Sequence, residues 1–345
     1  MGYTCWPMRA YEIQGSFGPE NLRLVERPRP ALLPGQVRIR VRAVSLNYRD
    51  QLTLEGSYNP RQTLPLVPCS DGAGEVIELG AGVSRVRLGD RVMGLFAQRW
   101  IASDPTADQL KSTLGGPNDG MLAEEVVLYE EGLVHVPEHL NFEQASTLPC
   151  AAVTAFSALE QCGLRAGDTV LVQGTGGVAI FALQFAVQRG AHVIVTSKSN
   201  EKLARAKSMG AIHGINYVEQ PEWAKRAREL THGRGVDLVL EVGGAGTFAR
   251  SVRAVRPGGA VALIGVLSGG SKEPLDSALV AILMQNIRVQ GVFVGHRERF
   301  EAMCVELSAA KLVPVIDQVF PFEQAPQAFA RMRSGEHFGK LVVRL

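Results

Sequence analysis

Three small residues stand at the spacing that a phosphate-binding turn requires. Gly174, Gly176 and Ala179 form the pattern G-x-G-x-x-A between an apolar run and an apolar helical segment. The first glycine permits a tight turn, the second lets the backbone approach a pyrophosphate, and the third small residue lets helix and strand pack closely. Since N–H groups at a helix start attract phosphate, the pattern predicts a dinucleotide site rather than a glycine-rich turn without a ligand. The expected contacts are Gly174, Thr175, Gly176, Gly177 and Val178.

The end of the next apolar run predicts which dinucleotide binds. NAD sites place an acid about 20 residues beyond the glycines, whereas NADP sites present neutral or positive groups there. In this chain the position falls at Ser197 and Lys198, and no acid occurs before Glu201. A lysine can neutralise a 2′-phosphate and a serine hydroxyl can donate to it, although a solvated surface lysine is the alternative interpretation. We therefore expect NADP(H) to be favoured over NAD(H).

The elements that must position these residues change character along the chain. From Met8 to about residue 130, short Val- and Ile-rich runs separated by glycine turns predict a mostly antiparallel, partly closed sheet. After about residue 150, nearly continuous apolar strands alternate with helical segments, which predicts a parallel sheet covered on both faces. The tail from about residue 297 reads as helix, strand, helix, strand, and we expect it to pack on the first domain.

Composition excludes several classes of function. With 345 residues, 36 Lys plus Arg and 34 Asp plus Glu, the chain has no net field that favours nucleic acid or an anionic membrane. Its apolar runs are far shorter than the roughly 18 residues of a membrane span, and the N-terminus lacks a signal-peptide layout. The five cysteines form no Cys-x-x-Cys pair, which fits reduced thiols. We expect a soluble, cytoplasmic, two-domain α/β protein that acts on a small molecule.

Several segments together resemble one family. They are LNYRD (46–50), DGAGEVIELGAGVSRVRLGDRVMG (71–94), LPCAAVTAF (148–156), RPGGAVALIG (256–265) and GEHFGKLVVRL (335–345). In order and spacing they resemble the medium-chain dehydrogenase/reductase family, in particular its zinc-free, quinone oxidoreductase-like members and related NAD(P)-dependent alcohol dehydrogenase-like proteins.

The resemblance implies a GroES-like catalytic domain of residues 1–130 and 297–345, and a Rossmann domain of residues 131–296. It also implies a homodimer that often forms through the strand following Asn286. Thr154 would lie near the nicotinamide and Tyr217 near the adenosine. The other cofactor contacts expected on this basis are Gly243, Gly265, Val266, Phe293, Val294, Phe338 and Lys340.

The same resemblance bears on zinc. A catalytic zinc needs three converging Cys, His or carboxylate ligands. Where the zinc-dependent branch has its first cysteine, this chain has Asn47, and its His-Glu pair is replaced by Ser70 and Asp71. Only Cys150 falls on a ligand position, and residues 90–130 contain no cysteine for a structural zinc. We therefore expect a metal-free site.

Hydride transfer without a metal favours particular acceptors. A quinone or an α,β-unsaturated carbonyl delocalises charge as hydride arrives, so a few hydrogen-bond donors suffice. Asn47, Tyr48 and Tyr58 are the expected catalytic donors. Several residues of this region have plainer interpretations: Tyr48 would merely pack a strand end, Arg49 and Asp50 would be a local ion pair, and Cys150 would be a structural thiol. Three functions remain open: a metal-free NADPH-dependent reductase, an alcohol or ketone dehydrogenase, and a nucleotide-binding protein with little turnover.

Overall fold

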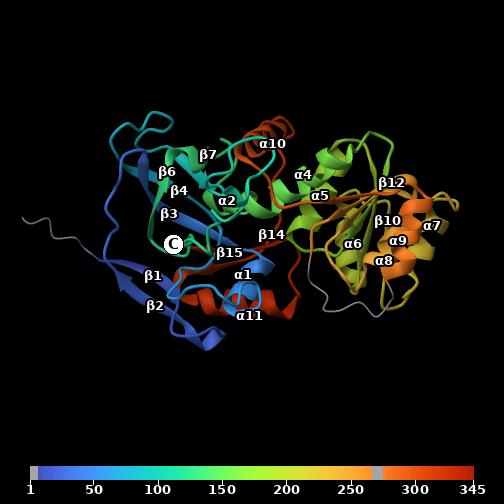
Figure 1. Ribbon diagram of the computed structural model, residues 1–345, viewed down its shortest axis with the longest axis horizontal. Helices are drawn as coiled ribbons and strands as arrows, with labels where there is room; N and C mark the ends of the chain where they lie inside the picture. The colour runs from blue at the N-terminus through green and yellow to red at the C-terminus, as the bar shows by residue number, and fades with distance from the viewer. Residues whose placement is uncertain (1–6, 266–274) are drawn as a thin grey trace, which may run out of the picture. The chain divides into compact units, whose positions relative to one another are not determined.

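The computed structural model describes residues 7–265 and 275–345. The chain divides into two compact units (Figure 1). The first unit runs to Val153 and resumes at Gly295, and the second spans Thr154–Val294. No helix in the described ranges is long and apolar enough to cross a membrane.

The first unit is built around a seven-stranded sheet in which all neighbours are antiparallel except one pair. In spatial order its strands are β14 (Ile316–Pro321), β15 (Lys340–Arg344), β3 (Gln36–Leu46), β4 (Asp71–Leu79), β5 (Arg91–Gly94) and β7 (Leu133–His135), and β6 (Glu125–Tyr129) pairs with β3. The parallel pair is β14 with β15. A separate antiparallel pair is formed by β1 (Met8–Ile13) and β2 (Leu22–Arg27). These strands confirm the expected mostly antiparallel GroES-like unit, and β15 joins the tail to it as expected.

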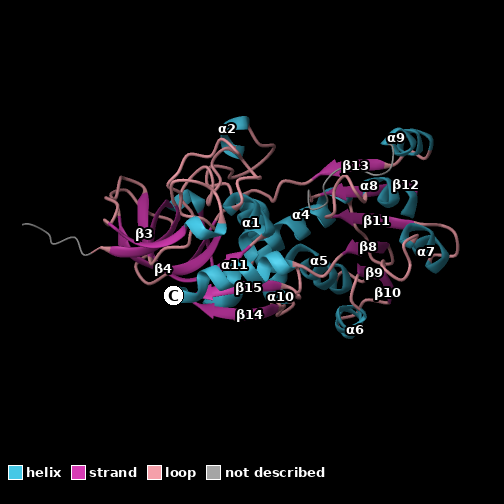
Figure 2. Cartoon of the chain, turned by 90° about the horizontal axis from the view of Figure 1, so that it is seen from below, coloured by secondary structure: helices cyan, strands magenta, loops and turns pink. Residues whose placement is uncertain are grey.

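Short helices connect and cover the strands of this unit. They are α1 (Tyr48–Leu54), α2 (Ala107–Leu110), α3 (Phe142–Ser146), the π-helical turn η3 (Leu148–Ala152), α10 (Arg297–Ala309) and α11 (Ala325–Ser334), with 3₁₀ turns η1 (Pro19–Asn21), η2 (Glu130–Gly132) and η4 (Phe322–Gln324). Figure 2 distinguishes these helices from the strands by colour.

Strand β3 shows how the first core forms. Val37, Ile39 and Val41 are buried at alternate positions, as expected where successive side chains point to opposite faces. The pairing with β4 shifts register between Val41 and Ala43, so the inward set continues at Val44 and Leu46. These side chains share one core with Phe329 and Met332 of α11 and with Leu341 and Val343 of β15.

The second unit is a six-stranded sheet whose pairs are all parallel. In spatial order its strands are β10 (His213–Asn216), β9 (His192–Ser197), β8 (Thr169–Gln173), β11 (Val236–Glu241), β12 (Val255–Leu263) and β13 (Arg288–Gly291). Between them run α4 (Val153–Cys162), α5 (Gly177–Gln188), α6 (Asn200–Ser208), α7 (Trp223–Leu230), α8 (Phe248–Ala254) and α9 (Leu275–Met284). The alternation of strand and helix confirms the predicted Rossmann unit.

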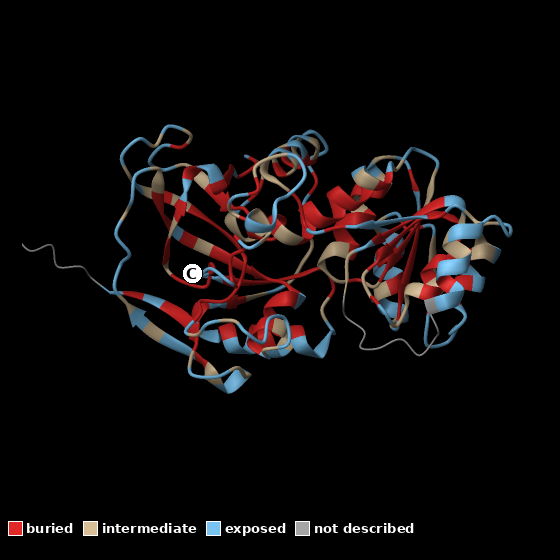
Figure 3. Ribbon diagram, in the orientation of Figure 1, coloured by how far each residue is buried: buried red, intermediate tan, exposed pale blue. Residues whose placement is uncertain are grey.

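Helices cover both faces of this sheet because its central strands are buried on both faces. In β8, Val170, Leu171 and Val172 are all buried, and Figure 3 shows the same for the neighbouring strands. Leu171 shares a core with α7, α8 and α9. Its strand neighbours point to the opposite face, where α5 packs on β8 and β9.

The boundary between the units differs from the predicted one. Residues 131–153, which the sequence interpretation assigns to the Rossmann domain, lie in the first unit. The physical reason is strand pairing: β7 hydrogen-bonds to β5 and so extends the first sheet. A short three-residue strand of this kind carries little periodicity in the sequence.

Candidate functional site

The predicted glycine turn joins β8 to α5. Gly174 has a φ of 76°, a left-handed conformation that glycine adopts without strain, and Gly176 is extended immediately before the helix begins at Gly177. Within the described residues, no side chain caps the start of α5. Its first N–H groups are therefore open to an acceptor, as the pyrophosphate of a dinucleotide would be. Thr175 and Val178 lie in the same turn, as the motif predicts.

The end of β9 lies beside this turn, because β8 and β9 are paired and the Gly174 N–H donates to Thr196 O at 2.9 Å. Ser197 is buried and its hydroxyl oxygen accepts from Ser199 N at 3.2 Å. Lys198 is exposed. Tyr217, whose ring is 41% exposed, is tied to this strand end by its N–H, which donates to Ser197 O at 3.1 Å. The structure thus brings together three of the residues predicted for the adenosine end of a dinucleotide.

A buried polar cluster lies at the ends of β8 and β11. The sequence analysis did not predict it. The Glu241 carboxylate has no exposed surface and accepts from Gln173 Nε2 at 2.8 Å, Gly244 N at 2.8 Å and Thr247 Oγ1 at 2.6 Å. Gln173 Oε1 in turn accepts from Gly243 N at 3.2 Å. The cluster orders the loop after β11 beside the glycine turn. Its only signal in the sequence is an acid that ends an apolar strand.

The remaining predicted cofactor contacts of the second unit have different surroundings. Thr154 is buried in the first turn of α4, and Phe293 is 39% exposed after β13. Val294 is buried with a φ of 46°. Gly265 follows β12 where a Cβ would lie 1.7 Å from Val242 O, so only glycine permits this approach. Val266 lies outside the described residues.

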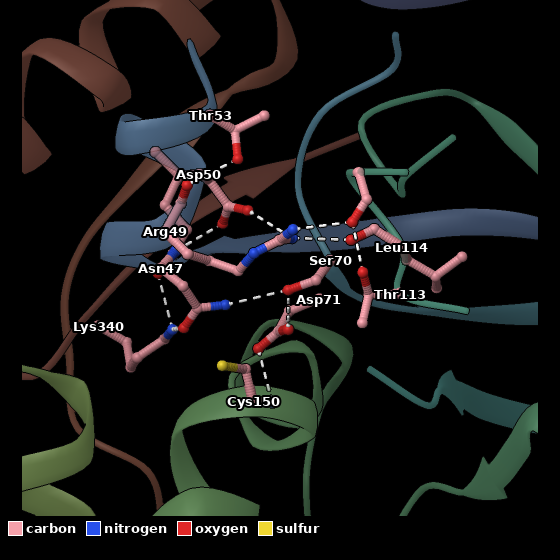
Figure 4. A network of polar contacts seen from close by, with 12 residues as sticks. Asn47, Arg49, Asp50, Thr53, Ser70, Asp71, Thr113, Leu114, Cys150 and Lys340 are labelled. Carbon is pink, nitrogen blue, oxygen red and sulfur yellow. Dashed lines mark hydrogen bonds and ion pairs between the residues drawn. The ribbon is translucent and has the colours of Figure 1, made fainter. Parts of the chain in front are cut away.

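The first unit contains a buried hydrogen-bonded network that joins four distant segments (Figure 4). The Lys340 ammonium donates to Asn47 Oδ1 at 2.6 Å and to Leu46 O at 2.7 Å. Asn47 Nδ2 lies 3.4 Å from Ser70 Oγ, and Ser70 Oγ donates to Asp71 Oδ1 at 2.6 Å. Asp71 Oδ2 accepts from Cys150 N at 3.0 Å. We call Asn47, Ser70, Asp71, Cys150 and Lys340 the Lys340 network.

Burial sets the protonation of the acids and thiols around this network. It raises the pKa of Asp71, and the Lys340 charge and the Ser70 hydrogen bond oppose that effect. It also raises the pKa of the Cys150 thiol. Asp50, the third residue of α1, has no exposed surface, and burial raises its pKa to about 6 despite the neighbouring Arg49. A raised carboxyl pKa means that the charged form is less favourable in the folded protein than in water.

The two predicted catalytic tyrosines lie near Arg49: Tyr48 precedes it in the chain, and the Tyr58 ring packs against its guanidinium. Tyr48 is the first residue of α1, and both it and Tyr58 are 40% exposed. Within the described ranges no hydrogen-bond partner is found for either hydroxyl. The Arg49 guanidinium lies 4.8 Å from the Tyr58 ring centroid and 5.1 Å from that of Phe96.

Arg49 itself has a structural role. It pairs with Asp50 at 3.4 Å and donates to Leu114 O at 2.8 Å and Gly116 O at 3.0 Å. The plainer interpretation of Arg49 and Asp50 as a local ion pair therefore matches the geometry. Arg49 also holds the Tyr58 ring against the loop that contains Leu114.

Two predicted cofactor contacts lie in the first unit. The Phe338 side chain is 1% exposed and the Lys340 side chain 2%. Lys340 points its ammonium at Asn47, so the structure joins a predicted cofactor residue to a predicted catalytic residue. His296, which is also in this unit, caps α10 by accepting from Arg299 N at 3.2 Å, and its ring packs on Trp100.

Comparisons with known proteins agree with this architecture. Residues 33–138 match the alcohol dehydrogenase GroES-like domain family, and residues 177–309 match the zinc-binding dehydrogenase family. A zinc-type alcohol dehydrogenase-like protein of Schizosaccharomyces pombe is 42% identical over 340 residues, which are 97% of each chain.

Solved structures give the same result. A candidate alcohol dehydrogenase of Sinorhizobium meliloti superposes with a TM-score of 0.91 at 43% identity, covering 99% of this chain and 100% of that one. The quinone oxidoreductase of Coxiella burnetii superposes with a TM-score of 0.81 at 30% identity, covering 98% and 99%. With both units and nearly the whole chain matched, the protein belongs to the medium-chain dehydrogenase/reductase family and is an NAD(P)-dependent oxidoreductase of that type.

Proposed function

We propose that this oxidoreductase works without a catalytic metal and transfers hydride from NADPH to a quinone or an α,β-unsaturated carbonyl. The observation that carries the proposal is the Lys340 network. By the family resemblance, its residues Asn47, Ser70, Asp71 and Cys150 stand where the zinc-dependent branch has its ligands. Here Lys340 bonds Asn47, Asn47 bonds Ser70, and Asp71 accepts from Ser70 and from the Cys150 backbone N–H.

The donor set does not fit zinc. In the described part of the chain no three His, Cys, Asp or Glu side chains are grouped to hold a metal ion. Both Asp71 oxygens already accept hydrogen bonds. The Lys340 ammonium bonds Asn47, and its charge would repel a cation. Because burial raises the pKa of Cys150, the thiolate that a metal requires is disfavoured.

The chain's own side chains suit a conjugated acceptor. Reduced NADP, held at the turn that contains Gly174, Gly176 and Gly177, would supply the hydride. The Asn47 amide and the hydroxyls of Tyr48 and Tyr58 are hydrogen-bond donors, and they would stabilise the negative charge that develops on the acceptor's oxygen. A tyrosine hydroxyl also supplies the proton that completes the reduction.

The preference for NADPH rests on the end of β9. Ser197 keeps its hydroxyl proton available to donate, because its oxygen accepts from Ser199 N. Exposed Lys198 adds a positive charge, and no acid that would bind a free 2′-hydroxyl occurs between Ser197 and Glu201.

A dehydrogenase for alcohols or ketones is the second candidate. It is favoured by the names of the relatives from Schizosaccharomyces pombe and Sinorhizobium meliloti, both described as of alcohol dehydrogenase type. Oxidising a simple alcohol requires a group that accepts the hydroxyl proton and stabilises an alkoxide, a task for which zinc is well suited. The two candidates therefore differ in their dependence on metal.

The deciding experiment follows NADPH oxidation by the purified protein with quinones, enones and simple ketones, before and after treatment with a zinc chelator. We expect turnover of quinones or enones that survives chelation, in protein whose zinc content is well below one ion per chain. Activity that disappears on chelation and returns with zinc would overturn the metal-free proposal. Turnover of alcohols and ketones alone would favour the second candidate, and tight NADPH binding without any turnover would favour a nucleotide-binding role.

A further inference from the structure

We propose that Lys340 is a positioning residue that fixes the orientation of the Asn47 amide, so that the Nδ2 hydrogens face away from the lysine and one of them donates to the acceptor's oxygen when the acceptor binds. This inference rests on the proposed function, in which Asn47 donates to that oxygen. It assigns Lys340 a role through Asn47 rather than through the cofactor.

The position of Lys340 follows from strand register. β15 pairs with β3 in antiparallel register, with Leu341 opposite Leu46. Lys340, the first residue of β15, therefore lies beside the end of β3, where Asn47 begins the turn into α1. Its side chain is 2% exposed, so the ammonium must find its partners inside the unit.

The chemistry of the two groups determines which way the amide points. An ammonium has three donors and no acceptor, whereas a primary amide has an oxygen that accepts and a nitrogen that donates. The 2.6 Å contact between Lys340 Nζ and Asn47 must therefore involve Oδ1. Rotating the amide by 180° would set donor against donor beside a buried charge.

The opposite end of the amide faces negative charge. Asn47 Nδ2 donates a long hydrogen bond to Ser70 Oγ at 3.4 Å. The Ser70 hydroxyl in turn donates to Asp71 Oδ1 at 2.6 Å. A cation at the oxygen and an acid beyond the nitrogen both polarise the amide in one direction, which strengthens its N–H groups as donors.

Asn47 is slightly more exposed than the two residues that its Nδ2 faces. It is 8% exposed, whereas Ser70 and Asp71 have no exposed surface. Its main chain is also fixed, because Asn47 N donates to Asp50 Oδ2 at 2.8 Å. With its backbone N–H and Oδ1 both held, the Asn47 amide has a defined orientation.

Three variants separate positioning from a purely structural role. Lys340→Met removes the ammonium but keeps a long apolar chain, and we expect kcat/KM for the acceptor to fall about 10- to 100-fold through lost orientation. Lys340→Gln can still donate to Asn47 Oδ1, and we expect it to recover part of that loss. Asn47→Asp keeps the partner of Lys340 but removes both N–H donors, and we expect a loss of about 100-fold.

The cofactor provides the internal control. In all three variants we expect the Kd for NADPH, measured by nucleotide fluorescence, to remain within about twofold of the unmodified protein. If Lys340→Met weakens NADPH binding more than it lowers acceptor turnover, Lys340 acts on the cofactor and the proposal is wrong. Equal losses in Lys340→Met and Lys340→Gln would likewise contradict it.

A spectroscopic measurement remains decisive if no acceptor is turned over. In protein labelled with ¹⁵N-asparagine, the side-chain amide signals of Asn47 are identified by their absence from Asn47→Asp. We expect Lys340→Met to shift this pair of signals and Lys340→Gln to shift it less. Signals that are unchanged in Lys340→Met would show that the lysine does not hold the amide, whatever reaction the enzyme catalyses.

Discussion

Asp50 is a carboxylic acid that has no solvent-exposed surface in the folded protein. Its carboxylate accepts from Asn47 N at 2.8 Å and lies 3.4 Å from Arg49 Nη1, yet burial still raises its pKa to about 6 from an ordinary value of 3.8. Because the folded protein binds this proton more tightly than the unfolded chain, the carboxyl stabilises the fold most below pH 4. That contribution is lost as the pH rises through about 6.

Asp50→Asn should reveal this dependence. The amide oxygen still accepts from Asn47 N but carries no charge at any pH. Between pH 4.5 and 7.5 we expect the free energy of unfolding of the variant to gain about 2 kcal/mol relative to the unmodified protein. Urea unfolding of both proteins at the two pH values measures the difference, and a difference that does not change with pH would mean that Asp50 titrates normally.

The proposed preference for NADPH can be tested at the same scale through Lys198. Lys198→Ala removes one exposed charge beside the proposed 2′-phosphate, so we expect the Kd for NADPH to rise about fivefold, which is ~1 kcal/mol for an exposed pair. The Kd for NADH should remain nearly constant. Lys225→Ala, which changes another exposed lysine of the same unit, serves as the control for net charge. Equal losses for both nucleotides would refute the assignment.

At the scale of elements, the parallel sheet requires backbone segments to approach one another closely where its strands end. β12 and β13 are neighbours, and each has a glycine near its end, but the two glycines have different surroundings. A Cβ at Gly265 would lie 1.7 Å from Val242 O, while one at Gly291 would meet nothing within 4 Å. The loop after β11 and the end of β12 are therefore packed together through Gly265.

The two alanine substitutions should differ accordingly. We expect Gly265→Ala to lower the free energy of unfolding by at least about 2 kcal/mol, because backbone must move to admit the methyl group. Gly291→Ala should change it by no more than about 0.5 kcal/mol. Thermal and urea unfolding without nucleotide would test both, and similar effects at the two positions would argue against the close approach.

At the scale of the whole molecule, one edge of the second unit has the character of an interface. β13 is the last strand of the six-stranded sheet and all four of its residues are exposed. The neighbouring helix α9 exposes apolar side chains at Leu279, Val280, Leu283 and Met284, which are 61%, 60%, 78% and 76% accessible. A bare edge strand and an apolar helix face are surfaces that monomers usually protect.

We propose that a second copy of the chain covers this edge. A two-fold axis would pair β13 with itself and place the α9 faces near one another, as an isologous contact requires. Leu283→Glu should then shift the mass in solution from about twice 37.2 kDa toward 37.2 kDa, measured by light scattering after size exclusion. Val305→Glu, at a 71% exposed position of α10, should leave the mass unchanged. A monomeric unmodified protein would exclude the dimer.

Much of the second unit is determined by local sequence. Its strands are apolar runs, its helices alternate with them, and the glycine turn follows its strand directly, so each signal lies within a few residues of the structure it predicts. Ser197 and Lys198 could be proposed as nucleotide contacts by counting from Gly176 for the same reason. The cluster around Glu241 escaped prediction because hydrogen bonding to an acid inside a core leaves no periodic pattern.

The Lys340 network depends on tertiary structure. Asn47 follows β3, Ser70 and Asp71 lie at the start of β4, Cys150 lies in η3 and Lys340 begins β15. They meet only because β15 pairs with β3 in a particular register and η3 approaches β4. Burial then affects their chemistry, since it raises the pKa of Asp71 and of Cys150. The sequence alone determined the two-unit architecture and the nucleotide turn, because neighbouring residues encode both. Only the folded chain could show that the predicted cofactor residue Lys340 bonds the predicted catalytic residue Asn47, since register and burial are properties of segments about 290 residues apart.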